Sequence, residues 1–333
     1  MYKVVITEFT FDNIEQEKKV LEPLGAQVVF ANCKTEADFI AACRDADAVI
    51  HHKGPVSRKV IEEMQKCRFI GGYGAGFDTV DVKAATERGI PVANTPGYCK
   101  EEVSDHALAL IYAMGRKLIW SHVAAVSGLK TWNPRPFRPM HRLLGQTVGL
   151  IGFGNIARTL AAKLKALNFV VLATDPYIPD ALFQKLGVER VTLDELLERS
   201  DFISLHTVLD EVTFHMISTP QLQRMKRSAY IINTCRGQVI DQEALTQALE
   251  KNVIAGAALD VLEDEPPTDA TRQRLFKLPN VIILPHTAWY SEEAMVDRQR
   301  MAAETVAIHL QGGRPDCVVN TEVYERRKAK KGV

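Results

Sequence analysis

The sequence predicts an α/β protein built from two doubly wound parallel-sheet domains. Short apolar runs alternate with helix-period segments almost from end to end of the 333 residues, which is the pattern of parallel β–α–β units. A stretch with three prolines in nine residues, 131–139, interrupts the alternation, and the pattern then starts afresh. The length also favours two domains over one core.

The first series of elements comes before residue 100. Helical periodicity predicts helices over 15–24 and 36–43, and then a long helix from Glu101 to Ile119 or beyond, where no breaker interrupts the apolar pattern. β-branched and apolar runs predict strands over 3–7, 27–30, 48–51, 69–73 and 91–93.

The second series follows the proline-rich stretch. A final helix is expected over 292–310, and residues 318–320 are expected to return to the first domain. The predicted domains are therefore 1–99 with 299–333, and 100–298. Strands are expected over 147–152, 170–174, 202–206, 230–233, 255–259 and 281–284.

Composition and charge exclude several classes of function. Lys and Arg together number 41, as do Asp and Glu, so no overall charge attracts nucleic acid. No apolar run reaches the roughly 18 residues of a membrane span, and the N-terminal run is too short for a signal peptide. The six cysteines show neither metal spacing nor a C-x-x-C pair, so we expect reduced thiols in the cytoplasm, no disulfide and no metal. The basic C-terminal tail is expected to be solvated.

A glycine turn after the strand over 147–152 predicts a dinucleotide site. Residues 152–157 read Gly-Phe-Gly-Asn-Ile-Ala, a G-x-G-x-x-A turn between a strand and a helix. Gly152 makes the tight turn, Gly154 lets the backbone approach a pyrophosphate, and Ala157 permits close packing of the helix on the strand. Together with Phe153 and the helix-start amides of Asn155 and Ile156, they are the predicted anion site.

The next strand ends in Asp175, 18 residues beyond Ala157. A carboxylate at this position accepts hydrogen bonds from both ribose hydroxyls and repels a 2′-phosphate, so NAD is predicted over NADP. The alternative is that Asp175 only begins a turn with Pro176.

Three later strands are followed by residues suited to reduction of a 2-oxo acid. Arg236 offers a guanidinium fork for a carboxylate and carbonyl, and His286 offers an acid that works near neutral pH. Glu265 is a carboxylate able to fix the histidine tautomer. Each has a structural alternative, namely a helix-capping or surface arginine, a loop glutamate and a strand-end histidine. Since all three follow parallel strands, we expect them at one edge of a sheet.

These segments resemble the D-isomer-specific 2-hydroxyacid dehydrogenases, in which Arg-Gly, Glu-Pro and Pro-His segments carry the catalytic Arg, Glu and His. The spacing of 29 residues from Arg236 to Glu265 and 21 to His286 fits that family, and the similarity spans nearly the whole chain. The resemblance implies a flavodoxin-like substrate domain and a Rossmann NAD-binding domain, with the active site in the cleft between them.

The resemblance also implies roles for further residues. A loop formed by Tyr73, Gly74, Ala75 and Gly76 is expected to bind the substrate carboxylate through backbone amides, unless it is only a tight turn. Trp289, in a segment similar to the C-terminal-binding-protein branch, is expected to line the substrate pocket or to pack in the core. Tyr73 and Phe77 also suggest room for an apolar substrate side chain. The remaining predicted cofactor contacts are His206, Thr207, Thr234, Cys235 and Asp260.

The sequence thus predicts an NAD-dependent oxidoreductase that moves a hydride to or from the 2-carbon of a small D-2-hydroxy or 2-oxo acid. The same resemblance implies a homodimer formed through the long helix and residues 132–142. An interaction protein that senses NAD(H) with little turnover is the alternative. Formate, phosphite and 3-phosphoglycerate-like substrates are weaker alternatives within the same fold.

Overall fold

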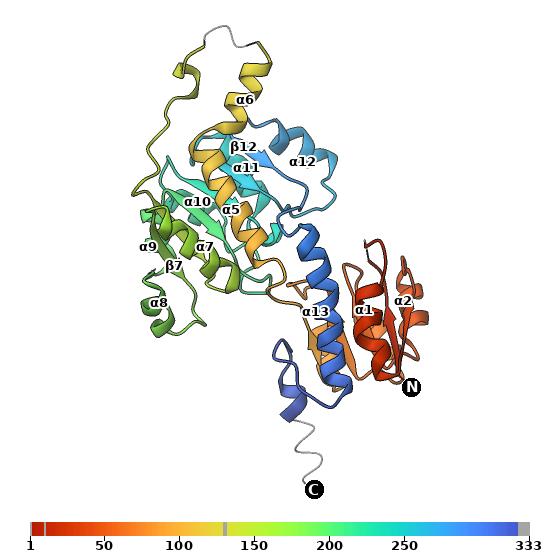
Figure 1. Cartoon of the computed structure of the whole chain (residues 1–333). Coiled ribbons are helices and arrows are strands. Elements are labelled where there is room, and N and C mark those ends of the chain that lie inside the picture. The colour runs from red at the N-terminus through yellow and green to blue at the C-terminus, as the bar shows by residue number, and fades with distance from the viewer. Residues whose placement is uncertain (1, 10, 129–131, 326–333) are drawn as a thin grey trace. The chain divides into compact units, whose positions relative to one another are not determined.

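Two parallel sheets organise the chain in the computed structural model, which describes residues 2–9, 11–128 and 132–325 (Figure 1). One sheet has the strand order β2-β1-β3-β4-β5 and the other β12-β11-β10-β9-β6-β7-β8. They belong to two compact units, residues 1–99 with 290–333 and residues 100–289. The predicted α/β class with two doubly wound sheets is confirmed.

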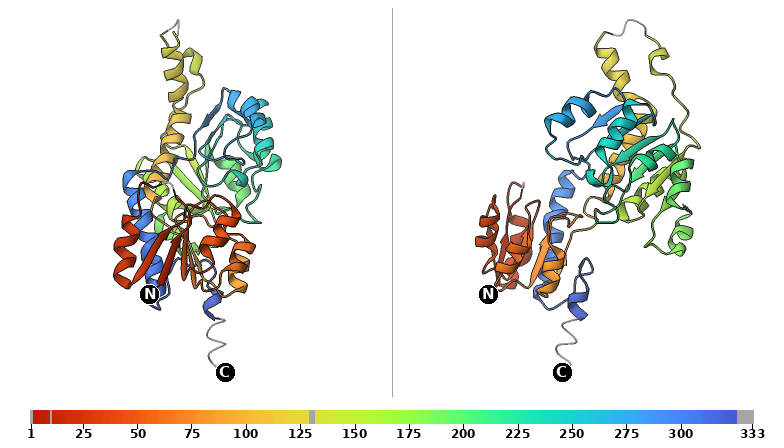
Figure 2. Two further views of the ribbon diagram at one scale, coloured as in Figure 1. Left: turned by 90° about the vertical axis from the view of Figure 1, so that its right-hand side faces the viewer. Right: turned by 180° about the vertical axis from the view of Figure 1, so that it is seen from behind.

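The first unit builds its sheet from residues before position 100 (Figure 2). Apolar clusters lie on both faces of this sheet, and α13 (Glu292–Leu310) covers one face together with α1. Its strands are β1 (Tyr2–Ile6), β2 (Ala26–Phe30), β3 (Ala48–His51), β4 (Phe69–Gly72) and β5 (Val92–Ala93). Its other helices are α1 (Glu15–Leu21), α2 (Glu36–Cys43), α3 (Arg58–Glu63) and α4 (Val82–Glu87), with a 3-10 turn, η1, over Glu22–Leu24.

The segment after α13 returns to this sheet, as the sequence predicted. Val318 forms an antiparallel bridge with Ala93, and the amide of Val319 donates to the Val92 carbonyl at 2.8 Å. The side chain of Asn320 accepts from the Val92 amide at 2.7 Å. The edge strand β5 therefore gains partners from the C-terminal segment.

The first unit resumes at Tyr290 rather than at the predicted residue 299. The predicted boundary is wrong because it divides α13, which is one continuous helix. Ser291 caps the helix by accepting from the Ala294 amide at 2.9 Å, so the helix begins directly beyond the boundary.

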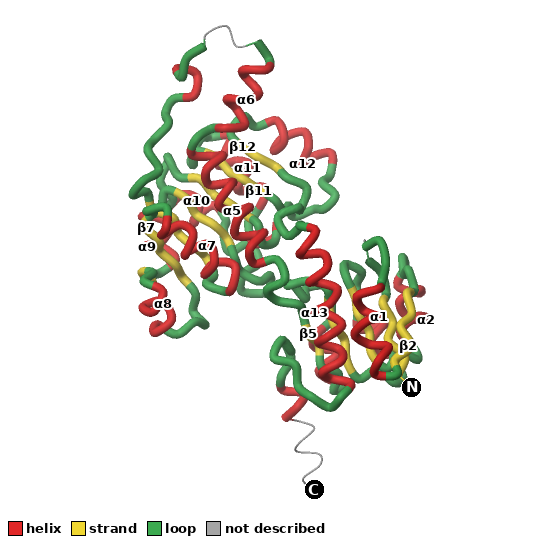
Figure 3. Tube along the Cα trace, viewed as in Figure 1, coloured by secondary structure: helices red, strands yellow, loops and turns green. Residues whose placement is uncertain are grey.

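The second unit contains the longer sheet (Figure 3). Its strands are β6 (Thr147–Ile151), β7 (Val170–Thr174), β8 (Glu189–Arg190), β9 (Phe202–Leu205), β10 (Tyr230–Asn233), β11 (Gly256–Leu259) and β12 (Val281–Ile283). Its helices are α5 (Lys100–Gly115), α6 (Leu118–Val126), α7 (Asn155–Ala166), α8 (Asp180–Leu186), α9 (Leu193–Arg199), α10 (Thr219–Arg224), α11 (Gln242–Glu250) and α12 (Asp269–Arg274). Three 3-10 turns, η2 (Arg135–Phe137), η3 (Gly237–Val239) and η4 (Leu275–Lys277), complete it.

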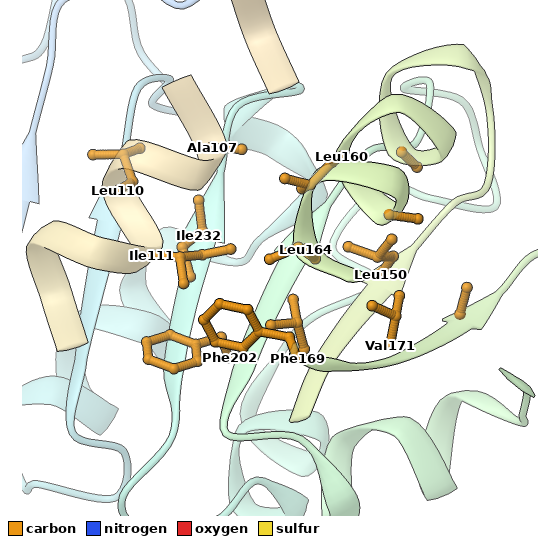
Figure 4. Close-up of a cluster of buried hydrophobic side chains, with 14 of the residues drawn as sticks. Ala107, Leu110, Ile111, Leu150, Leu160, Leu164, Phe169, Val171, Phe202 and Ile232 are labelled. Carbon is orange, nitrogen blue, oxygen red and sulfur yellow. The ribbon is translucent and has the colours of Figure 1, made fainter. Parts of the chain in front are cut away.

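Helices α5 and α7 cover one face of this sheet with apolar side chains (Figure 4). Ile111 and Leu164 from these helices meet Phe202 and Ile232 from the strands. A second apolar cluster fills the opposite face. None of the helices within the described ranges combines the length and apolar composition that a membrane span requires.

The predicted long helix is in fact two helices. Helix α5 ends at Gly115, Lys117 adopts a left-handed conformation at φ 52°, and α6 begins at Leu118. A side chain at position 115 would meet Leu143 at 2.7 Å, so glycine is kept there by close packing although it weakens the helix. The prediction failed because the apolar pattern continues across Gly115, although glycine is a weak helix former.

Candidate active site

The glycine turn that follows β6 is shaped to hold an anion. Gly152 has φ 86°, and a Cβ there would lie 2.6 Å from the His206 carbonyl oxygen, so only glycine fits. Gly154 has open space where a side chain would stand, and it caps α7. Among the described residues, the helix-start amides of Asn155 and Ile156 have no acceptor. These features fit the pyrophosphate of a dinucleotide.

Phe153 and Asp175 tie this turn to the next strand. Phe153 packs its buried ring on Phe183 at a centroid distance of 4.5 Å, and its amide donates to Asp175 Oδ2 at 2.8 Å. Phe153 therefore braces the turn. The other oxygen of Asp175 accepts from the Tyr177 amide at 2.9 Å. Asp175 thus begins a turn, which is the structural alternative to a cofactor role. It also lies directly after β7, where a ribose contact is expected.

The ends of β9 and β10 bring four predicted cofactor residues together, because the two strands are paired. His206 contacts Ser204 Oγ through Nε2 at 2.9 Å, and burial lowers its pKa to about 4. Thr207 and Cys235 approach through Oγ1 and Sγ at 4.0 Å. The Oγ1 of Thr234 is buried and, within the described part of the chain, has no hydrogen-bond partner. An unsatisfied buried hydroxyl at a strand end fits a polar ligand.

Cys235 behaves as a structural thiol. Its Sγ contacts Asn233 Oδ1 at 3.1 Å, and burial raises its pKa. A protonated, half-buried thiol is a poor nucleophile, so the geometry favours a structural role for Cys235 over a redox role.

His286 and Glu265 form a direct pair. The His286 Nδ1 lies 2.6 Å from Glu265 Oε2, and both side chains are partly exposed, at 27% and 35%. The other carboxylate oxygen accepts from the Leu262 amide at 3.0 Å. Glu265 is therefore fixed by the backbone. Because it contacts Nδ1, the Nε2 of the imidazole is the nitrogen that can exchange a proton with a substrate.

The backbone of His286 lies in the left-handed region, at φ 55°. Its amide donates to the Asp260 carbonyl at 2.8 Å, and its carbonyl accepts from the indole N–H of Trp289 at 3.0 Å. These bonds hold a conformation that costs about 1–2 kcal/mol for a residue with a side chain. Trp289 thus supports the turn that presents His286.

Asp260 fixes the chain beyond His286. This buried carboxylate accepts from the amides of Thr287 and Ala288, each at 2.9 Å. His106, on α5, places Nε2 3.7 Å from the same carboxylate. No sequence pattern predicts this contact, because the two residues are 154 positions apart.

Arg236 follows β10, and its Nη1 donates to the Cys235 carbonyl at 2.8 Å. The next residue, Gly237, packs against the segment that carries Glu265, because a Cβ there would lie 1.9 Å from the Leu262 backbone. Strands β10, β11 and β12 are neighbours in the sheet. Arg236, Glu265 and His286 therefore follow three adjacent strands at one edge, as the sequence predicted.

In the first unit, the loop after β4 exposes a run of backbone amides. Within residues 2–9, 11–128 and 132–325, the N–H groups of Gly74, Ala75 and Gly76 have no acceptor. The loop is fixed from behind, since Asn94 Nδ2 donates to the Ala75 carbonyl at 2.6 Å and the Thr95 amide to the Gly74 carbonyl at 2.8 Å. Consecutive free amides suit a carboxylate.

Tyr73 does not join these amides. Its side chain is fully buried, and its hydroxyl donates to Glu17 at 2.5 Å. Its amide and carbonyl bond to His51 and to Arg298. The prediction that Tyr73 contacts the substrate is therefore wrong, because all its polar groups serve the core of the first unit.

Residues 108–288, more than half of the chain, match the model of a family described as D-isomer specific 2-hydroxyacid dehydrogenase, NAD binding domain. The chain belongs to this family. The resemblance seen in the sequence is confirmed, as is the prediction of NAD as cofactor.

Relatives and solved structures agree with this assignment. A glyoxylate reductase of Korarchaeum cryptofilum is 40% identical over 293 residues, 87% of this chain and 87% of that enzyme. A D-3-phosphoglycerate dehydrogenase of Methanocaldococcus jannaschii is 36% identical over 322 residues, 96% of this chain, but the chain spans only 60% of that enzyme. The structure of a D-lactate dehydrogenase from Aquifex aeolicus, complexed with NAD and lactic acid, has a TM-score of 0.82 and 26% identity, covering 93% of this chain and 96% of that one.

Proposed function

We propose that the protein reduces a small 2-oxo acid to the D-2-hydroxy acid, or catalyses the reverse oxidation, with NAD(H). The observation that carries the proposal is the 2.6 Å contact between His286 and Glu265, beside the strand end that bears Arg236. A histidine oriented by a carboxylate can protonate a carbonyl oxygen, and an arginine at the same edge of the sheet can bind the substrate carboxylate.

In the proposed mechanism, Arg236 binds the carboxylate and carbonyl of the substrate. NADH, when bound, supplies the hydride that adds to the carbonyl carbon. His286 delivers its proton to the carbonyl oxygen, which becomes the hydroxyl of the product. Glu265 fixes the tautomer and the orientation of the His286 imidazole. In the oxidation direction, His286 accepts the same proton.

We assign the cofactor to the second unit. Gly152, Gly154 and the amides of Asn155 and Ile156 would hold the pyrophosphate, and Asp175 would bind the adenosine ribose. The negative charge of Asp175 opposes a 2′-phosphate, so NADH is expected to be preferred over NADPH. His206, Thr207, Thr234 and Cys235 would line the site at the ends of β9 and β10, and Asp260 would accept from the nicotinamide amide.

In the first unit, the free amides of Gly74, Ala75 and Gly76 would bind a carboxylate, and in the second unit Trp289 would contact the substrate side chain. The names of two relatives, a glyoxylate reductase and a D-lactate dehydrogenase, favour substrates as small as glyoxylate or lactate.

The test follows NADH oxidation against a panel from glyoxylate and hydroxypyruvate through pyruvate to phenylpyruvate, with NADPH in parallel. Turnover with NADH on one class is the expected result. The variant His286→Ala should lose at least about 10²-fold in kcat, because the general acid is gone. No turnover by the wild type on any acid of the panel, with NADH still bound, would refute the proposal.

We also propose that the protein is a homodimer. Helix α6 leaves Leu118, Ile119, Val123 and Val126 exposed by 56%, 47%, 52% and 71%, and Trp132 is exposed by 85%. Apolar side chains gathered on one short segment are typical of a surface covered by a partner. Residues 132–142, which follow this helix, would complete the interface.

A further inference from the structure

A second histidine–glutamate pair lies on the same loop as the proposed catalytic pair. His215 places Nε2 2.5 Å from Glu263 Oε1, while His286 places Nδ1 2.6 Å from Glu265 Oε2. The two glutamates are only two residues apart, in the loop that follows β11. The proposed mechanism uses the Glu265 pair and leaves the Glu263 pair without a role.

Glu263 bonds this loop to two neighbouring elements through its backbone and its side chain. Its carboxylate accepts from the Gln242 amide at 3.2 Å, and its own amide donates to Gln242 Oε1 at 3.2 Å. Its carbonyl accepts from Gln238 Nε2 at 2.8 Å. Glu263 is therefore tied to the start of α11 and to η3, as well as to His215.

The backbone of His215 adopts a conformation that is unfavourable for a residue with a side chain. Its φ is 50°, in the left-handed region, which costs about 1–2 kcal/mol. Its amide donates to the Gln238 carbonyl at 2.8 Å, and the ring of Phe214 stacks on the imidazole at 4.0 Å. The surrounding contacts thus maintain a strained backbone that aims the imidazole at Glu263.

The pair is connected to the proposed catalytic residues through short stretches of backbone. Leu262 precedes Glu263, and its amide donates to Glu265 Oε1 at 3.0 Å. Gly237 packs against the Leu262 backbone and lies between Arg236 and Gln238. A shift of Glu263 would therefore move both Glu265 and the segment that carries Arg236.

The side of the loop that carries Glu263 borders open space. A cavity of about 560 Å³ borders His215, Glu263 and Gln242. Leu262 is buried in the apolar core, but the Glu263 side chain lines the cavity, so polar bonds hold this side chain in place. Truncation of the Glu263 side chain would leave His215 without its carboxylate partner and free the loop to move toward the cavity.

We propose that His215 and Glu263 are positioning residues that hold Glu265, and through it His286, in the geometry required for proton transfer. The proposal rests on the proposed function, because it concerns the same acid. Its predicted signature is a loss of kcat with an unchanged KM for NADH.

The experiment compares Glu263→Ala with Glu263→Gln and with Glu243→Gln. Glu263→Ala should lower kcat about tenfold, since displacement of a catalytic group by a fraction of an ångström has effects of this order. The KM for NADH should change less than about twofold. Glu263→Gln keeps an acceptor for His215 and Gln242 and should restore most of the rate. Glu243 borders the same cavity but pairs with Arg274, so Glu243→Gln should match the wild type.

A double-mutant cycle tests whether Glu263 acts through Glu265. In a Glu265→Gln background, Glu263→Ala should cost no more than about twofold further, because the group that it positions is already lost. If Glu263→Ala does not fold, His215→Gln is measured in its place. Full activity of Glu263→Ala, or effects of the two substitutions that multiply, would overturn the proposal. An inactive wild type would instead remove the proposed function itself.

Discussion

Replacement of Asp260 by asparagine should destabilise the segment that presents His286. The carboxylate is 1% exposed and accepts from the amides of Thr287 and Ala288, each at 2.9 Å. An asparagine keeps one acceptor oxygen and turns an NH₂ group toward the other amide. One charge-assisted hydrogen bond is lost, and two donors are left facing each other in a buried site.

The magnitude follows from these two effects. A hydrogen bond to a charged group contributes about 1.5–3 kcal/mol, and a buried unsatisfied donor costs about 1–3 kcal/mol. We expect the free energy of unfolding to fall by about 3 kcal/mol in Asp260→Asn. Urea unfolding of the full chain, followed by circular dichroism and tryptophan fluorescence, measures this change. Trp289 provides a local reporter, since its indole bonds to the His286 carbonyl.

Asp241→Asn is the matched control. Asp241 caps α11 by accepting from a single amide, that of Ala244, at 2.9 Å. Asparagine caps a helix about as well as aspartate, so stability should change by less than about 0.5 kcal/mol. A loss below about 1 kcal/mol in Asp260→Asn would refute the reasoning, because it would mean that the two hydrogen bonds from the Thr287 and Ala288 amides contribute little.

Two further predictions concern pH and assembly. Burial lowers the pKa of His51 from 6.5 to about 4, so the unfolded chain binds more protons than the folded chain as the pH falls between these values. The contribution of His51 to the free energy of unfolding is full above about pH 6.5 and falls by about 3 kcal/mol toward pH 4. The free energy of unfolding, measured at pH 7 and at pH 4.5, should therefore decrease less in His51→Asn than in the wild type. Val126→Asp places a charge on the proposed interface of α6 and should convert a dimer to a monomer in sedimentation experiments; a monomeric wild type would remove the proposed interface.

Local rules placed most of the sheet correctly from the sequence. The strands over 48–51, 170–174 and 230–233, and the helix over 292–310, have the predicted bounds, because continuous apolar runs and helical periodicity mark buried elements directly. The short edge strand β8 was missed, since two residues, Glu189–Arg190, carry no periodic pattern.

Tertiary contacts explain the features that could not be predicted from the sequence. Aromatic residues are common both in cores and in pockets, so nothing in the sequence distinguished Tyr73 from a pocket residue. Its burial depends on Glu17, 56 positions earlier. Glycine at position 115 is likewise required by the packing of Leu143, and His106 lies beside Asp260, 154 positions later. These partners meet only after the chain has folded.

The sequence by itself determined the α/β class, the glycine turn at residues 152–154, and the order of Arg236, Glu265 and His286 along the chain. These follow from hydrophobic period, from the need for glycine in a tight turn and from the rule that parallel strands end at one edge. Only the tertiary structure decided which histidine meets which glutamate. That choice depends on left-handed backbone at His215 and His286, and contacts distant in the sequence impose it.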